Sequence, residues 1–96
     1  MAYFKVTEVI DGSTFTITPG WKWQEQTGHK VRAAGYSAPG INEPEGQVAR
    51  DKLSGLVLGR YVELKAVYKV DNGQLVCDVF FPGVNLAEYF PEYAES

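Results

Sequence analysis

The chain has one cysteine and one histidine among its 96 residues, and these two shortages exclude several kinds of chemistry. A single thiol cannot form an internal disulfide or a cysteine-rich metal site. Cys77 lies inside an apolar run, which favours a buried thiol over a reactive one. Ser-His or Cys-His catalysis would depend on His29 alone, in a loop, so we expect neither.

Long hydrophobic runs are also missing, and basic residues are outnumbered. No apolar stretch approaches the roughly 18 residues of a membrane span, and nothing resembles a secretory signal. We therefore expect a soluble protein without membrane contact, or a domain excised from a longer protein. Nine Lys and Arg against 12 Asp and Glu give a net charge of −3. Because duplex-binding proteins usually carry a basic patch, this balance favours a protein or peptide partner over nucleic acid.

What is present is a series of short strands. Stretches rich in β-branched and aromatic residues predict strands at 3–10, 15–18, 30–36, 60–68 and 74–81. A helix is expected from about Asn42 to Leu58, and a short closing helix at 84–90 before a frayed tail at 91–96. Three strands, a helix, a hairpin and a short helix predict one domain, mainly β, built as a small closed or partly closed antiparallel barrel.

Two segments allow two interpretations each. Residues 20–28 are predicted to be a polar loop that holds Trp21 and Trp23. These rings could form an exposed platform for a ligand, or they could pack over the open end of the barrel. The acidic stretch from Glu88 to Glu95 could bind a partner, or it could be a solvated tail with two of its rings packed back.

The residues from Val31 to Gly40 form the stretch where a chemical site is expected. They are predicted to be a buried strand that carries Arg32 and runs into a Ser-Ala-Pro-Gly turn. Strand alternation places Arg32 and Tyr36 on one face. Arg32 either pairs with Asp11 or Glu45, or is available to a ligand.

Six motifs, in chain order, resemble those of the staphylococcal nuclease (thermonuclease-like) family. They are Val9-Ile10-Asp11-Gly12-Ser13-Thr14, Val31-Arg32, Ala38-Pro39, Glu43-Pro44-Glu45-Gly46-Gln47-Val48-Ala49, Leu58-Gly59-Arg60-Tyr61-Val62-Glu63-Leu64 and Gly83-Val84-Asn85-Leu86. The resemblance covers nearly the whole chain, without the family's further C-terminal helix. It implies a five-stranded OB-fold barrel with its main helix between the third and fourth strands. The family's reaction is calcium-assisted phosphodiester cleavage, which needs carboxylates for the cation, a Glu to activate water and two Arg to stabilise charge.

Carried onto this chain, the resemblance places most catalytic positions on residues that lack those groups. The second Asp of the family's Asp-Gly-Asp-Thr motif is Ser13 here. The Asp and the Glu of its Asp-(Ala/Thr)-Pro-Glu turn are Ser37 and Gly40, and the Arg of its Tyr-Gly-Arg hairpin is Gln74. Only the strand Arg is kept, as Arg32, with Asp11 as a lone nearby carboxylate.

The expected function is therefore binding without catalysis. Neutral serines cannot offset the desolvation of a divalent cation, and glutamine carries no charge for a transition state, so we expect no metal and no cofactor. The predicted role is a catalytically inactive module for a protein, a peptide or an anionic ligand, with binding side chains Arg32, Tyr36, Gln74, Trp21 and Trp23. The alternative is a rearranged site that cleaves phosphodiesters weakly with calcium, with Glu43 as the base, or that binds single-stranded nucleic acid.

Overall fold

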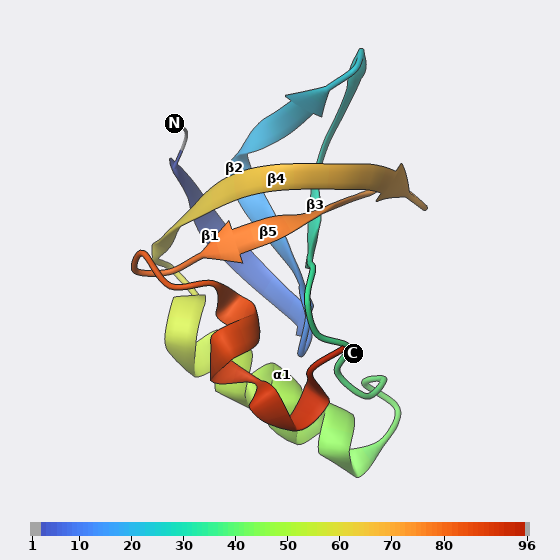
Figure 1. The fold of residues 1–96 in the computed structure, drawn as a ribbon, viewed down its shortest axis with the longest axis vertical. Coiled ribbons are helices and arrows are strands. Elements are labelled where there is room, and N and C mark those ends of the chain that lie inside the picture. The colour runs from blue at the N-terminus through green and yellow to red at the C-terminus, as the bar shows by residue number, and fades with distance from the viewer. Residues whose placement is uncertain (1–2, 96) are drawn as a thin grey trace.

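Five strands and three helical segments follow one another in the computed structural model, which describes residues 3–95 (Figure 1). They are β1 (Tyr3–Asp11), β2 (Thr14–Trp23), β3 (Gln26–Ala33), α1 (Pro44–Val57), β4 (Tyr61–Asp71), β5 (Gln74–Phe80) and the 3-10 segments η1 (Leu86–Tyr89) and η2 (Pro91–Tyr93). The short closing helix expected at 84–90 is therefore a single shorter 3-10 segment, η1. In Figure 1, α1 and the two 3-10 segments lie together at one end of the strands.

The strands close into a barrel in the order β1-β2-β3-β5-β4, with β4 returning beside β1. The predicted antiparallel pairing holds for every pair of neighbours except β3 and β5, which run parallel. Closure matters because an open sheet would leave a row of unpaired backbone groups at each edge. The mainly β fold is confirmed: it is a closed five-stranded OB-fold-like barrel with its helix between the third and fourth strands. Within residues 3–95, no helix is long and apolar enough to cross a membrane.

Strand alternation fills the interior of the barrel. The parallel β3–β5 ladder, for example, pairs Val31 with Leu75 and Ala33 with Cys77, and all four side chains are buried. The thiol of Cys77 is fully buried, as predicted, and burial, followed by the nearby charge of Asp78, raises its pKa to about 12. The full core cluster is Val6, Phe15, Ile17, Trp21, Val31, Ala33, Tyr36, Leu53, Val57, Val62, Leu75, Cys77, Val79, Leu86 and Phe90.

The first turn of α1 packs directly against the loop that follows β3. A Cβ atom on Gly46 would lie 1.8 Å from the carbonyl oxygen of Gly40, so no larger residue fits at this helical position. The helix begins at Pro44, after Glu43, whose side chain makes no capping hydrogen bond. The helix was therefore predicted to begin two residues too early, near Asn42. The close contact between Gly46 and Gly40 holds the loop after β3 against the first turn of the helix.

The second and third strands are longer than predicted. A loop at 20–28 was expected after Pro19, but β2 continues to Trp23 and β3 begins three residues later. The β2–β3 ladder is interrupted between Thr16 and Trp21, so Pro19 lies where no ladder hydrogen bond is required. The Pro19-Gly20 pair predicted the end of the strand at Thr18. In the structure, β2 continues past this pair, and the side chain of Trp21 beyond it is buried in the core.

The third strand ends earlier than predicted, and the tail is not frayed within the described residues. β3 stops at Ala33 because Gly35 has a φ of +96°, a left-handed conformation that glycine tolerates. This turn sends Tyr36 into the core instead of along the face of the strand. The tail forms η2 and then pairs with the turn through a Tyr36–Ala94 bridge, while Ser96 lies outside the described residues.

Candidate functional site

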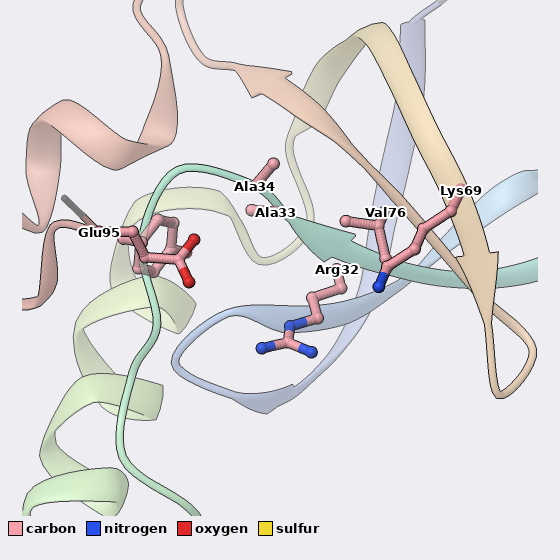
Figure 2. A pocket seen from close by; sticks show the side chains of 7 residues that line it. Arg32, Ala33, Ala34, Lys69, Val76 and Glu95 are labelled. Atoms are coloured by element: carbon pink, nitrogen blue, oxygen red, sulfur yellow. The ribbon is translucent and has the colours of Figure 1, made fainter.

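A hollow lies on the outer side of the barrel, where β3, β5 and β4 run side by side. Arg32 of β3 pairs with Val76 of β5, and Val76 pairs with Lys69 of β4. Because paired residues share a sheet face, Arg32 and Lys69 flank Val76, roughly 10 Å apart at the backbone. The hollow, called here the Arg32–Lys69 pocket, has a volume of about 190 Å³ and is lined by Arg32, Ala33, Ala34, Tyr36, Lys69, Val76 and Glu95 (Figure 2).

The pocket gathers two cations and one carboxylate. Figure 2 shows the side chains of Arg32, Lys69 and Glu95 around the same space. Among residues 3–95, neither cation has a carboxylate oxygen within 4 Å, so the alternative in which Arg32 pairs with Asp11 or Glu45 is not formed. The pocket lining therefore holds two positive charges against one negative charge, on a chain whose net charge is −3.

The other positions that the nuclease resemblance singled out do not line this pocket. Ser13 is buried, and its amide and hydroxyl donate to Oδ1 of Asp11 at 2.9 and 3.3 Å. Ser37 is exposed in the loop after β3, and Gly40 lies in the part of that loop that meets α1. Gln74 pairs with Lys30. It therefore lies on the same sheet face as the pocket, at the preceding outward position of β5. The structure thus brings one of the five degenerate site positions, Arg32, into the pocket.

Tyr36 lines the pocket but does not offer its hydroxyl to a ligand. Its side chain is buried, and the hydroxyl donates to the carbonyl of Gly12 at 2.8 Å. Its ring stacks on Phe90, with centroids 4.6 Å apart. Burial, followed by the charge of Asp11, raises the pKa of this phenol well above its usual value. The prediction that Tyr36 shares a face with Arg32 was wrong, because it assumed that the strand continued through Gly35.

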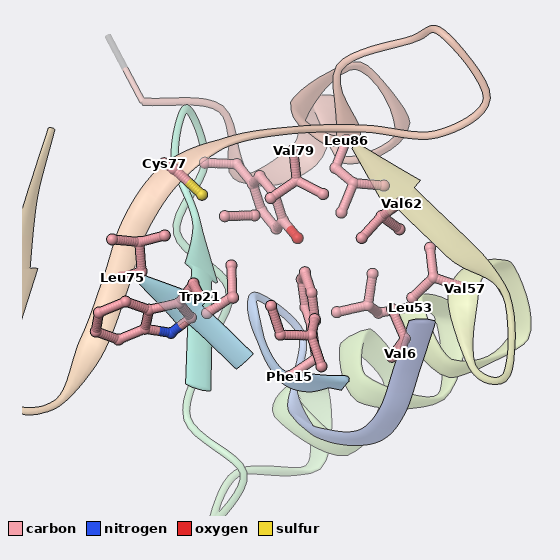
Figure 3. Close-up of a cluster of buried hydrophobic side chains, with 14 of the residues drawn as sticks. Val6, Phe15, Trp21, Leu53, Val57, Val62, Leu75, Cys77, Val79 and Leu86 are labelled. Carbon is pink, nitrogen blue, oxygen red and sulfur yellow. The ribbon is translucent and has the colours of Figure 1, made fainter. Parts of the chain in front are cut away.

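The two tryptophans differ in what they contact. Trp21 is buried, its Nε1 donates to the carbonyl of Lys30 at 2.7 Å, and Figure 3 shows its indole beside Leu75 in the core. Trp23 is half-buried and packs against the same cluster. Neither residue lies in a loop, and Trp21 is unavailable as an exposed platform, so the packing interpretation holds for it.

Lys69 and Glu95 also belong to the pocket, although Lys69 was not singled out in the sequence and Glu95 was named only as the end of an acidic stretch that could bind a partner. A signal for Lys69 was present, because the hairpin turn at Asn72-Gly73 sets the register of β4 and β5 and so places Lys69 opposite Val76. Glu95 had no comparable signal, since its position depends on how the tail docks on a distant loop.

The comparisons with known proteins add no family to this description. No protein-family model matches the chain, and no curated protein matches it. Among residues 3–95, no group of three or more His, Cys, Asp and Glu side chains is placed so that it could share a metal ion. The site is therefore described by its own geometry: a closed five-stranded barrel that carries a partly enclosed basic pocket on its β3–β5–β4 face.

Proposed function

We propose that this protein is a non-catalytic binding module and that its Arg32–Lys69 pocket holds a carboxylate group of a peptide or protein partner. The observation that carries the proposal is the pair of cations that flank Val76 and face one hollow without a carboxylate within 4 Å among residues 3–95. Arg is suited to planar, bidentate recognition of carboxylates, and a neighbouring Lys adds a second charge. Binding an anion between them would relieve their mutual repulsion.

The pocket suits a single anionic group better than a nucleic-acid strand. Its volume of about 190 Å³ far exceeds the roughly 10–15 Å³ that one water needs, so it has room for a small anionic group. A strand binder would combine a basic groove with stacking rings along it, whereas Trp21 is buried and the exposed rings of Tyr3, Tyr61 and Tyr68 do not line the pocket. The net charge of −3 also opposes a polyanion more strongly than it opposes one carboxylate.

We also propose that the chain is a relative of the staphylococcal nuclease family that has given up the reaction. The six motifs and the OB-fold-like barrel support the relation. Neutral residues at Ser13, Ser37, Gly40 and Gln74 support the loss of chemistry, because calcium sites rely on carboxylate oxygens. The amide spectrum is expected to stay unchanged on calcium titration, and the protein is expected to leave single-stranded DNA intact. Saturable shifts at Asp11 and Ser13, or calcium-dependent cleavage, would overturn this part of the proposal.

A titration with glutarate, a small dicarboxylate, tests the binding site. We expect saturable shifts of the amides of Arg32 and Val76 in ¹H–¹⁵N spectra. Arg32→Gln should weaken binding about tenfold or more, because hydrogen bonds to charged groups contribute about 1.5–3 kcal/mol. Lys69→Gln should weaken it less, since an ammonium acts as a point charge.

A matched control separates the pocket from general charge. Lys22 is an exposed cation of β2 that does not line the pocket, so Lys22→Gln removes the same charge elsewhere. It should leave glutarate affinity unchanged. Equal losses in Lys22→Gln and Arg32→Gln would mean that glutarate responds only to net charge, and the proposed site would be wrong.

A further inference from the structure

The C-terminal segment docks beside the pocket as a short added strand. The Ser37 amide donates to the carbonyl of Tyr93 at 3.0 Å, and the Glu95 amide donates to the carbonyl of Gly35 at 3.2 Å. Between these two hydrogen bonds, Tyr36 and Ala94 form an antiparallel bridge. Residues 93–95 thus pair with residues 35–37 in the way that an extended peptide adds to an exposed backbone.

This pairing delivers a carboxylate to the basic pocket. Glu95 lines the hollow, and Figure 2 shows its carboxylate on the side opposite Lys69, with Arg32 between them. Glu95 makes no ion pair within 4 Å in the described part of the chain, so free space remains between it and both cations. The chain's own tail therefore reaches the pocket without filling it.

The segment is held firmly up to Tyr93 and weakly beyond it. Phe90 is buried and stacks on Tyr36, and the ammonium of Lys52 lies 4.5 Å from the centroid of the Phe90 ring. Lys52 also donates to the carbonyl of Tyr89 and pairs with Glu92 at 3.2 Å. Ala94 and Glu95, by contrast, are exposed, and Glu95 is held to the loop by one backbone hydrogen bond. These two residues can leave without disturbing the anchor.

We propose that residues 93–95 are an internal stand-in for the partner. The partner is then an extended acidic peptide that pairs with the backbone of residues 35–37 and places a Glu or Asp side chain in the Arg32–Lys69 pocket. Its binding displaces Ala94 and Glu95 and takes the Ser37 amide from the carbonyl of Tyr93, so the tail competes with weakly binding ligands for this site. This inference rests on the carboxylate-binding function proposed above, and it adds the shape of the partner and the way the site is regulated.

The experiment compares wild type with Glu95→Gln, which keeps the tail backbone and removes its carboxylate. The probe is the peptide acetyl-Tyr-Ala-Glu-amide, titrated into ¹⁵N-labelled protein. A tethered group acts at an effective concentration of about millimolar, so removing its charge should tighten peptide binding about threefold or more. The amides of Gly35 and Ser37 should shift on binding, and so should those of Ala94 and Glu95 in the wild type, because the peptide displaces them.

Two controls isolate the stand-in. Glu88 is an exposed acid on the same C-terminal segment that does not line the pocket, so Glu88→Gln removes an equal charge and should leave the affinity at the wild-type value. The peptide acetyl-Tyr-Ala-Gln-amide lacks the carboxylate and should bind at least about threefold more weakly than the Glu peptide.

The possible results distinguish a failure of the tail's proposed role from a failure of the proposed carboxylate-binding function. Arg32-dependent binding of glutarate, with peptide affinity equal in wild type and Glu95→Gln and no shift at Gly35 or Ser37, would overturn the stand-in and leave the carboxylate site in place. Failure of both glutarate and peptide to shift Arg32 would overturn both. Arg32-dependent binding of oligothymidylate more tightly than of either carboxylate would also overturn both, in favour of nucleic acid.

Discussion

The covered end of the barrel and its β3–β5–β4 face differ in whether their polar side chains have close partners. At the covered end, where α1 and the C-terminal segments pack, the hydroxyl of Tyr36 donates to Gly12 and its ring stacks on Phe90. On the β3–β5–β4 face, Arg32 and Lys69 have no carboxylate within 4 Å among residues 3–95. The difference indicates that the covered end contributes to stability, whereas Arg32 and Lys69 on the outer face contribute no ion pair to it within the described chain.

The largest effect is expected at the stacked ring of the covered end. Phe90→Ala removes a fully buried side chain that packs on Tyr36 and under Lys52, so it should lower the free energy of unfolding by about 3–5 kcal/mol. Urea denaturation measures the loss. Tyr61→Ala, at a ring that is 60% exposed, should change stability by less than about 0.5 kcal/mol. Similar losses in the two variants would show that the tail is not part of the core.

Two glycines of α1 give a matched pair. Gly46→Ala would place its Cβ atom against the Gly40 carbonyl, so it should destabilise the protein by at least about 2 kcal/mol despite the better helix propensity of alanine. Gly55→Ala meets nothing within 4 Å and should stabilise by about 0.5–1 kcal/mol. Thermal unfolding of both variants gives the signs. A stabilising Gly46→Ala would contradict the close loop–helix contact.

Removing only the hydroxyl of Tyr36 tests how much its hydrogen bond to Gly12 contributes to stability. Tyr36→Phe keeps the stacked ring but leaves the carbonyl of Gly12 without this donor, so it should cost about 1–3 kcal/mol of unfolding free energy at neutral pH. Tyr68→Phe also removes a hydroxyl, one that donates to Asp78 at an exposed site, and should cost less than about 0.5 kcal/mol. Equal losses of unfolding free energy in the two variants would mean that the Tyr36–Gly12 hydrogen bond is no better protected from water than the Tyr68–Asp78 hydrogen bond.

The same residue shapes the response to alkaline pH. Burial raises the pKa of Tyr36 above its usual 10.0 and that of Cys77 from 9.0 to about 12, so the fold favours the neutral form of each group. Such a group stabilises fully below its unfolded pKa, and the stabilisation is lost as the pH rises from there towards the folded pKa. Unfolding free energy should therefore fall above about pH 9, and more steeply above pH 10. In Tyr36→Phe the slope above pH 10 should be shallower by about 1.4 kcal/mol per pH unit, and an unchanged slope would contradict the burial of the phenol.

The smallest effect is expected on the pocket face. Arg32→Gln and Lys69→Gln remove charges without close carboxylate partners in the described chain, and each also relieves repulsion with the other cation. Each should change unfolding free energy by less than about 0.5 kcal/mol in urea titrations, while glutarate affinity falls. A loss of more than about 2 kcal/mol in either variant would mean that the cation is structural, and the contrast between the two regions would disappear.

Much of the fold could be predicted from local patterns. The order of strands and helix follows from short β-branched runs and from one strong hairpin signal, Asn72-Gly73, whose residues both have positive φ in the structure. The length of β2 could not be predicted, because burial of Trp21 in the core outweighs the Pro19-Gly20 signal. Local sequence patterns predict an element correctly where turn residues determine its end. They fail where burial against distant parts of the chain determines it.

The candidate site could be predicted only in part for the same reason. Arg32 stands out in the sequence as a cation on a buried strand. Lys69 reaches the same pocket only through the parallel pairing of β3 with β5, which links segments far apart in the chain. The position of Glu95 depends on the docking of the tail at Gly35, whose left-handed conformation the strand pattern did not indicate.

The most direct test of the central claim is the Arg32 guanidinium itself. Its Nε–H resonance can be followed while glutarate is added to the wild-type protein at neutral pH. If the Arg32–Lys69 pocket holds carboxylates, this resonance should shift along a saturable curve, and Lys69→Gln should weaken the fitted affinity. A resonance that stays in place, or that drifts linearly with added salt, would contradict the claim that this face of the barrel is a carboxylate-binding site.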